Sequence, residues 1–184
     1  KISENGWQQL KIAEKIKGQA VTYFFNGFYQ EPHPGEIWKI IPSSHQPLYE
    51  NPLLQTSQLT NLLLSALKEN IYHFILVNFS APDIVAHTGN VDLGVKVVEG
   101  IDHYLDIIYK NIKDSDWVLI ITSDHGNIED MVNYLSGEIT TTHNTNPVPC
   151  YIIHQDFYLA EKSKEIKAKE KEINYSLANI APTI

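Results

Sequence analysis

The chain has 184 residues, 43% of them hydrophobic, and a formal net charge of −8, which is the composition of one ordinary globular domain. The negative charge argues against a general binder of nucleic acids or anionic membranes, and no apolar run approaches the roughly 20 residues that span a bilayer. Cys150 is the only cysteine, so an internal disulfide and a thiolate metal cluster are excluded, which fits a reducing compartment.

Both ends of the sequence look cut. Residues 1–6 resemble the last turn of a helix that stops at Gly6, and residues 176–184 start a helix without a termination signal. The chain also begins with Lys1 rather than with methionine. We therefore expect residues 1–184 to be a single partial domain, with no internal repeat or domain boundary.

The first part of the chain is predicted to contain a strand, a long loop and a helix. Residues 19–27, QAVTYFFNG, are rich in β-branched and aromatic residues and end in Asn-Gly, which predicts a strand. Residues 28–51 contain four prolines and predict an ordered loop, with a short strand at residues 37–41. Residues 57–70 repeat apolar side chains with a period near 3.6, which predicts a helix.

The second part alternates strands and helices. Residues 73–79 and 117–122 are short aliphatic runs that predict buried strands of a parallel sheet, and residues 92–111 form a helical stripe between them. We then expect a short helix, a polar loop, a strand and a solvated charged segment, at residues 128–135, 136–149, 149–154 and 161–172. The alternation predicts an α/β fold, with a mostly parallel sheet covered by helices on both faces.

Three polar clusters follow these strands. Asp83 and His87 are four residues apart, so on a helical turn they share one face, about 6 Å apart at Cβ; the alternative is a helix cap and a surface histidine. Asp124 and His125 directly follow the strand at residues 117–122, where the alternative is a capping turn. His143 lies in a loop of threonines and asparagines, where an exposed histidine is the alternative.

Together these clusters bring three histidines and two carboxylates to the expected carboxyl edge of one sheet. Nitrogen and oxygen ligands without thiolate suit Zn²⁺ or Mn²⁺ better than Ca²⁺. Two such ions, about 3.5–4 Å apart, can clamp a phosphoryl group during its transfer. The sequence therefore predicts a divalent metal site suited to phosphoryl transfer.

The order of the motifs resembles the alkaline-phosphatase-like metalloenzymes and, more narrowly, the cofactor-independent (2,3-bisphosphoglycerate-independent) phosphoglycerate mutase family. The ligand pattern is Asp-x-x-x-His, then SDHGN, then THNTNPVP. The segments KIAE, VTYFFNG, NFSAPDIVAHTG and SLANIAPTI follow in the order of that family. The resemblance covers nearly the whole chain.

The resemblance implies a metal centre with two Mn²⁺ ions. Asp83, His87 and His143 match the ligands of one ion, whereas Asp124 and His125 match ligands of the other.

Lys17 matches the family's lysine that meets the substrate phosphoryl group, where a point positive charge offsets the charge of the transferring group. Residues 15–20 match the family poorly, so Lys15 is an alternative for this role, and residues 45–54 also depart from the family pattern.

The resemblance also implies an isomerase that interconverts 2- and 3-phosphoglycerate through a phosphoserine intermediate in glycolysis and gluconeogenesis. Its partner would be a small-molecule substrate, and the full-length protein would be a cytoplasmic monomer. The family's nucleophilic serine, a further metal-binding aspartate and the substrate-binding domain lie upstream of the matched segment. Ser80 and Ser123 lie near the ligands, but we expect both to be structural.

The chain is thus expected to be the C-terminal half of the phosphatase-like domain and to lack mutase activity by itself. One alternative is another phosphotransferase of the superfamily, such as a phosphopentomutase or a phosphodiesterase. The other alternative is a non-catalytic domain that keeps the sheet and a metal.

Overall fold

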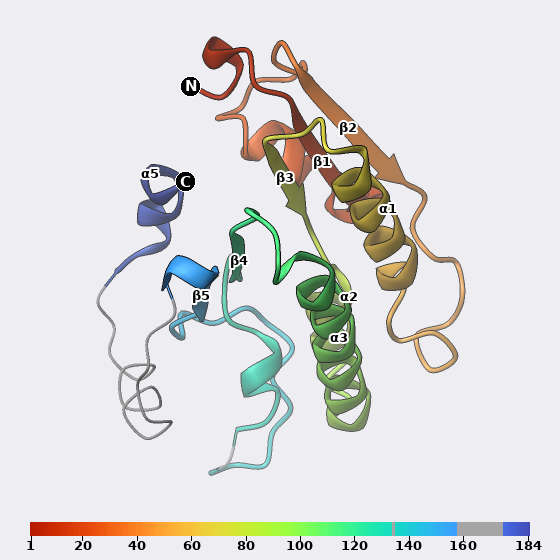
Figure 1. Cartoon of the computed structure of the whole chain (residues 1–184). Coiled ribbons are helices and arrows are strands. Elements are labelled where there is room, and N and C mark those ends of the chain that lie inside the picture. Colours follow the sequence, from red (N-terminus) through yellow and green to blue (C-terminus); the bar gives the residue numbers. More distant parts are fainter. Residues whose placement is uncertain (134, 158–174) are drawn as a thin grey trace.

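The computed structural model describes residues 1–133, 135–157 and 175–184 (Figure 1). The strands are β1 (Gln9–Glu14), β2 (Glu36–Ile41), β3 (Phe74–Val77), β4 (Leu119–Thr122) and β5 (Cys150–Ile153). The α-helices are α1 (Thr56–Glu69), α2 (Ala81–Ala86), α3 (Val91–Ile112) and α5 (Ile180–Thr183). Shorter turns are η1 (Ser3–Asn5), η2 (Lys15–Lys17), η3 (Ala20–Phe24), η4 (Ile128–Asp130), η5 (Gln155–Phe157) and η6 (Leu177–Asn179).

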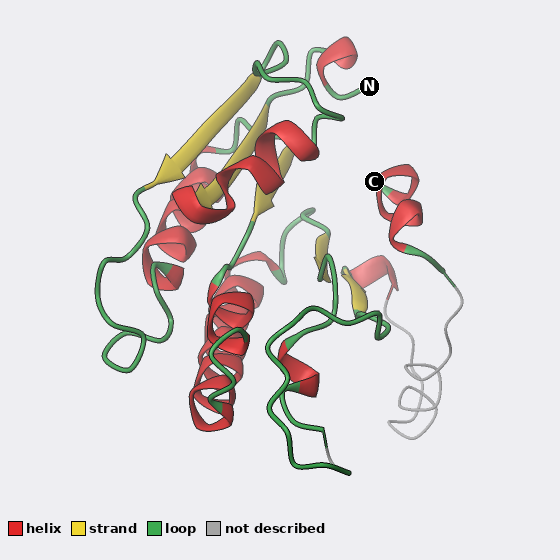
Figure 2. Ribbon diagram, turned by 180° about the vertical axis from the view of Figure 1, so that it is seen from behind, coloured by secondary structure: helices red, strands yellow, loops and turns green. Residues whose placement is uncertain are grey.

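A parallel three-stranded sheet in the order β2-β1-β3 organises the first part of the chain. All six residues of the central strand β1 are buried. Leu10 and Ile12 pack against Leu59 and Leu63 of α1 on one face of this sheet. The turn η3 lies on the other face, as the two opposite views show (Figures 1 and 2). The predicted α/β class, with helices on both faces of a parallel sheet, is confirmed.

A buried ion pair lies on the η3 side of this sheet. Lys11 Nζ is 2.6 Å from Glu36 Oε1, and both side chains are fully buried. Burial lowers the pKa of Lys11. Burial alone would raise the pKa of Glu36, but hydrogen bonds from Lys11, Trp38 and the His33 backbone outweigh it and hold that pKa below its ordinary value. Glu36 therefore lies against Lys11 in its carboxylate form.

The prediction of a strand at residues 19–27 is wrong. Residues 20–24 form the π-helical turn η3, in which the Thr22 hydroxyl donates to the Gly18 carbonyl. The aromatic side chains of this segment pack on one another, with 5.1 Å between the ring centroids of Tyr23 and Phe24. The strand lies earlier, at β1, where Leu10 and Ile12 alternate with the polar residues Gln9 and Lys11, and the polar residues are buried as well.

Most other predicted elements are confirmed, with small shifts at their ends: β2, α1, β3, α3, β4 and β5. The helix predicted at residues 128–135 is wrong in length, because η4 covers only three of these residues. At the chain ends, Gly6 caps η1 in a left-handed conformation, and residues 177–183 form η6 and α5. The charged segment at residues 161–172 lies outside the described residues.

Strand β4 differs from the prediction in its partner. It pairs antiparallel with β5, with Leu119 opposite Ile153, and the two strands form a separate two-stranded sheet. The prediction that β4 belongs to the parallel sheet, made from its aliphatic run, is therefore wrong for the described residues.

Helix α3, which comes before β4 in the sequence, packs against α2 through Val85 and Val97. Among the described residues, no helix is both long and apolar enough to cross a membrane.

Candidate metal centre

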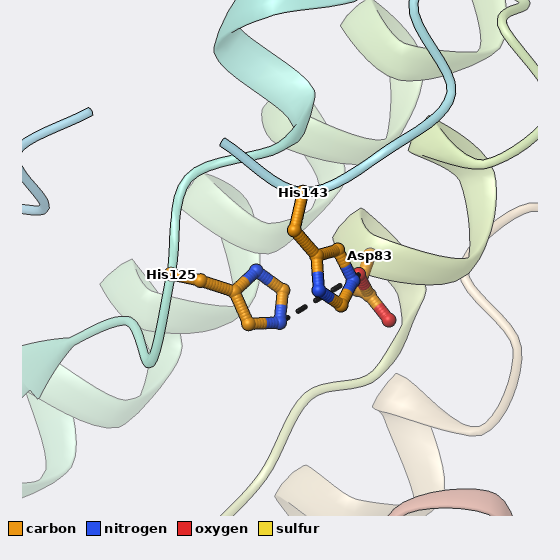
Figure 3. Close-up of side chains that lie close together, drawn as sticks. All are labelled: Asp83, His125 and His143. Carbon is orange, nitrogen blue, oxygen red and sulfur yellow. Dashed lines mark hydrogen bonds and ion pairs between the residues drawn. The ribbon is translucent and has the colours of Figure 1, made fainter. Parts of the chain in front are cut away.

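Five side chains from separate elements converge where the parallel sheet faces the second part of the chain. Asp83 lies on α2, and His87 caps the C-terminal end of that helix. Lys17 lies on η2, directly after β1. His125 follows β4, and His143 comes from the long loop before β5. Figure 3 shows the imidazoles of His125 and His143 directed at the Asp83 carboxylate.

Asp83 is the centre of this cluster. Its Oδ1 lies 3.0 Å from His143 Nε2, 3.3 Å from His87 Nε2 and 3.9 Å from His125 Nε2. The Nε2 atoms of His87 and His143 are 3.1 Å apart. The other carboxylate oxygen, Oδ2, lies 2.6 Å from Lys17 Nζ. One carboxylate therefore contacts three imidazoles and one ammonium.

The spacing of these atoms fits a shared divalent cation. Ligand atoms bound to one ion at about 2.1 Å and at right angles lie about 3.0 Å from each other. The triangle of Asp83 Oδ1, His87 Nε2 and His143 Nε2 has sides of 3.0, 3.1 and 3.3 Å. Asp83, His125 and His143 also form a compact group, with ligand atoms within 4.8 Å of one another. The carboxylate and imidazole donors suit a transition-metal ion.

His87 is oriented as a metal ligand. Its Nδ1 lies 2.7 Å from the backbone carbonyl oxygen of Thr141. A carbonyl oxygen can only accept, so Nδ1 donates its proton to Thr141, and Nε2 is the ring nitrogen that faces the cluster. Metal-binding histidines are commonly fixed by such a hydrogen bond from the second ring nitrogen.

Electrostatics keep Asp83 ionised. Burial would raise the pKa of this carboxyl group, but hydrogen bonds from Lys17 and Asn127 and the charge of Lys17 outweigh burial and lower the pKa to about 2. The Asn127 side chain donates to Asp83 Oδ1 at 2.9 Å. Asp83 is thus a carboxylate at neutral pH, which is the form that binds a cation.

Asp124 stands apart from the compact group. Its side chain is 66% exposed, and its Oδ1 lies 3.5 Å from His125 Nε2. His125 itself lies against His143, with ring centroids 3.6 Å apart and an angle of 20° between the ring planes. The structure therefore brings all five predicted ligand side chains into one neighbourhood, with Asp124 on its solvent side.

The two candidate lysines differ in position. Lys17 reaches the cluster through its ion pair with Asp83, whereas Lys15 is exposed. The two serines near the ligands are engaged elsewhere. The Ser80 hydroxyl is buried and donates to Glu14 Oε1 at 2.8 Å, and the Ser123 hydroxyl donates to the His125 carbonyl oxygen at 2.8 Å.

The sequence pattern missed three groups that orient the ligands. They are the Asn127 side chain, the Thr141 carbonyl and the Glu129 carboxylate, which accepts hydrogen bonds from both loops of the site. Asn127 lies in the SDHGN segment, two residues after His125, so its proximity to the site could have been inferred. The role of a backbone carbonyl has no sequence signal.

Fold and site together define an α/β protein with a cluster of carboxylate and imidazole side chains that could hold a metal ion. The family model of the Metalloenzyme superfamily matches residues 1–184, and the chain belongs to this superfamily. The chain is 39% identical over all its residues to a 2,3-bisphosphoglycerate-independent phosphoglycerate mutase of Clostridium botulinum, and 40% identical to one of Gracilaria tenuistipitata var. liui. The resemblance inferred from the motifs is confirmed, and superfamily membership and the ligand cluster together indicate metal dependence.

The fold has a match among solved structures. A structure of Leishmania mexicana phosphoglycerate mutase at low cobalt concentration superimposes with a TM-score of 0.77 and 29% sequence identity. The match covers 83% of this chain and 30% of that chain. The chain likewise spans 34% of the length of the Clostridium and Gracilaria relatives, which is about a third.

Proposed function

We propose that the chain is the metal-binding part of a cofactor-independent phosphoglycerate mutase, an isomerase that interconverts 2- and 3-phosphoglycerate. The observation that carries this proposal is the placement of three histidine Nε2 atoms within 3.0–3.9 Å of Asp83 Oδ1, with Lys17 on the other oxygen. The curated relatives, which are named as this mutase and align with the whole chain, support the choice of reaction.

The proposed metal is Mn²⁺, with two ions in the complete site, because the donors are imidazoles and carboxylates without thiolate. Asp83, His87 and His143 would hold one ion, while Asp124 and His125 would contribute to the other. When bound, the ions supply Lewis-acid polarisation of the phosphoryl oxygens and offset their negative charge.

Lys17 has a defined task in this proposal. Its ammonium is held at the edge of the cluster by Asp83 Oδ2, at 2.6 Å. A fixed positive charge at this place stabilises the negative charge that spreads over the oxygens of a transferring phosphoryl group. Lys15, which is exposed, is not held beside the ligands in this way.

We also propose that residues 1–184 are the C-terminal half of the phosphatase-like domain, and that other segments of the enzyme supply the nucleophilic serine and the substrate-binding domain. The positions of Ser80 and Ser123 agree with this, since Ser80 is buried and pairs with Glu14, and the Ser123 hydroxyl donates to the backbone of its own loop. We further propose a cytoplasmic enzyme that acts as a monomer on a small-molecule substrate. The absence of a second cysteine in the sequence agrees with a reducing compartment.

A chimaeric enzyme tests the proposal. Residues 1–184 would replace the matching segment of the Clostridium botulinum relative, and conversion of 3- to 2-phosphoglycerate would be assayed with Mn²⁺ and without 2,3-bisphosphoglycerate. We expect Mn²⁺-dependent turnover that is lost in Lys17→Ala and retained in Lys15→Ala. The 184-residue chain alone should bind Mn²⁺ and show no turnover.

Two outcomes would contradict the proposal. A folded chimaera that binds Mn²⁺ without turnover would favour the non-catalytic alternative. Turnover by the 184-residue chain alone would show that the nucleophile lies within these residues.

A further inference from the structure

The two loops that carry His125 and His143 are joined by close contacts. The Asn144 backbone N–H donates to the Gly126 carbonyl oxygen at 2.9 Å. A Cβ at Gly126 would lie 2.0 Å from Asn144 Oδ1 and 2.4 Å from Glu129 Oε1, so any larger residue would displace both of these side chains. Among the described residues, no helix or strand contains His125 or His143, so these loop contacts hold the two imidazoles in place.

A single carboxylate lies at the junction of these loops. Glu129 Oε1 accepts hydrogen bonds from the side-chain amides of Asn144, at 2.8 Å, and Asn146, at 3.0 Å. Glu129 Oε2 accepts from the backbone N–H of Asn127 at 2.8 Å. Burial would raise the pKa of Glu129, but the hydrogen bonds led by that from Asn144 outweigh it, so the pKa lies below its ordinary value. We call these four residues, Asn127, Glu129, Asn144 and Asn146, the Glu129 network.

The Glu129 network reaches the metal ligands on both sides. Asn127 is buried, and its side chain donates to Asp83 Oδ1 at 2.9 Å. Asn144 directly follows His143, whose ring stacks on that of His125. The Glu129 carboxylate therefore holds the backbone of Asn127, whose side chain orients Asp83. It also holds the side chain of Asn144, the residue next to His143 in the sequence.

We propose that Glu129 is a positioning residue of the metal centre, which orders the two ligand loops so that His125 and His143 face the centre beside Asp83. The inference rests on the proposed function for the presence of a metal ion. Outer-shell partners of this kind set the orientation of ligands, and their loss typically weakens metal binding about 10–100-fold. Glu129 acts through its neighbours and does not itself reach the ion.

The substitution Glu129→Gln tests this role in the 184-residue chain. Glutamine keeps the shape of the side chain but turns an NH₂ group toward at least one of the donors that the carboxylate accepts. We expect Mn²⁺ affinity, measured by isothermal titration, to fall about 10–100-fold while the melting temperature of the metal-free chain stays the same. Glu138→Gln is the matched control, because Glu138 is exposed and its side chain accepts only from Ser136 among the described residues.

A double-mutant cycle with His143→Ala shows whether Glu129 acts through that ligand. In the His143→Ala background, Glu129→Gln should cost less affinity than in the wild type, because the loop no longer carries a ligand. Equal Mn²⁺ affinity in Glu129→Gln and Glu138→Gln would overturn the proposal. A fall in melting temperature of Glu129→Gln that accounts for its weaker binding would overturn it as well.

Hydrogen exchange of the metal-free chain separates this inference from the proposed function. The Asn144 amide, bonded to Gly126, should exchange faster in Glu129→Gln, while amides of β1 should keep their protection. If the wild type bound no Mn²⁺, the metal centre and the positioning role would both be refuted. Faster exchange at Asn144 would then show only that the loop contacts depend on Glu129.

Discussion

The two parts of the molecule that build the site hold their residues in different ways. The packed region, residues 1–112, has a continuous core that includes Leu10, Ile12 and Leu59. In the loop region, residues 119–157, Met131 is the one buried hydrophobic side chain among the described residues, and Leu135 and Ile139 are exposed.

The two regions each supply part of the metal centre. The packed region supplies Lys17, Asp83 and His87 from elements that the core fixes. Within it, the buried hydrogen bond from Ser80 to Glu14 joins the end of β1, before Lys17, to the start of α2, before Asp83. The loop region supplies Asp124, His125 and His143 from loops that the Glu129 network holds. Substitutions of core residues in the packed region should therefore act on stability, and substitutions in the loop region should act on metal affinity.

The largest expected effect is on the stability of the packed region. Glu36→Gln removes the partner of the buried Lys11 ammonium and should lower the free energy of unfolding by about 3–5 kcal/mol. Urea titration of the metal-free chain measures this. The control is Asp106→Asn, which breaks an exposed ion pair with Lys110 and should cost less than about 1 kcal/mol. Similar losses in the two variants would refute the contrast between buried and exposed pairs.

The next largest effect is expected on Mn²⁺ binding, at Asp83, which contacts Lys17 of the packed region and His143 of the loop region. Asp83→Asn should weaken Mn²⁺ binding by more than the roughly 100-fold of an outer-shell substitution, because the carboxylate supplies the negative charge of the first ligand group. Electron paramagnetic resonance of free Mn²⁺ measures the affinity. Asp92→Asn, at an exposed position of α3, is the control. Retained affinity in Asp83→Asn would show that the ion binds elsewhere.

A smaller effect should appear in the pH dependence of the metal-free chain. The folded pKa of Asp83 is about 2, below its ordinary value of 3.8, so its stabilising contribution is present above about pH 4 and is lost as the pH falls toward 2. Lys17→Met removes the main group that lowers the pKa of Asp83. The free energy of unfolding of this variant should therefore change less between about pH 4 and pH 2 than that of the wild type. Lys15→Met, at an exposed position, should follow the wild type; if it behaved like Lys17→Met, the assignment of Lys17 would fail.

The smallest effect is expected at His154, a histidine of the loop region that does not belong to the ligand cluster. His154 lies after β5, and its Nδ1 is 3.4 Å from an oxygen of Asp156, outside the ligand cluster. His154→Ala should leave Mn²⁺ affinity unchanged, whereas His143→Ala should abolish tight binding. Calorimetry on both variants compares them directly. Equal affinity in the two would remove His143 from the ligand set.

The sequence by itself determined most regular elements and the chemistry of the site. The periodicity of residues 57–70 and 92–111 and the aliphatic runs at β3 and β4 are local signals, and they persist in the fold. The residue types and spacing in Asp-x-x-x-His, SDHGN and THNTNPVP were sufficient to select five candidate ligands and the superfamily. Each of these signals depends on neighbours in the chain.

Only the tertiary structure decided what depends on distant residues. Strand β1 buries Lys11 as well as Leu10 and Ile12, because the Lys11 ammonium is paired with Glu36, which lies far along the chain on β2. The antiparallel partner of β4 is a strand beyond the ligand loop. The position of Lys17 rather than Lys15 beside Asp83 depends on Glu14, at the end of β1, which accepts hydrogen bonds from Ser80 before α2 and from Gln55 before α1. The role of Glu129 likewise arises from amides of a second loop, which no pattern around residue 129 specifies.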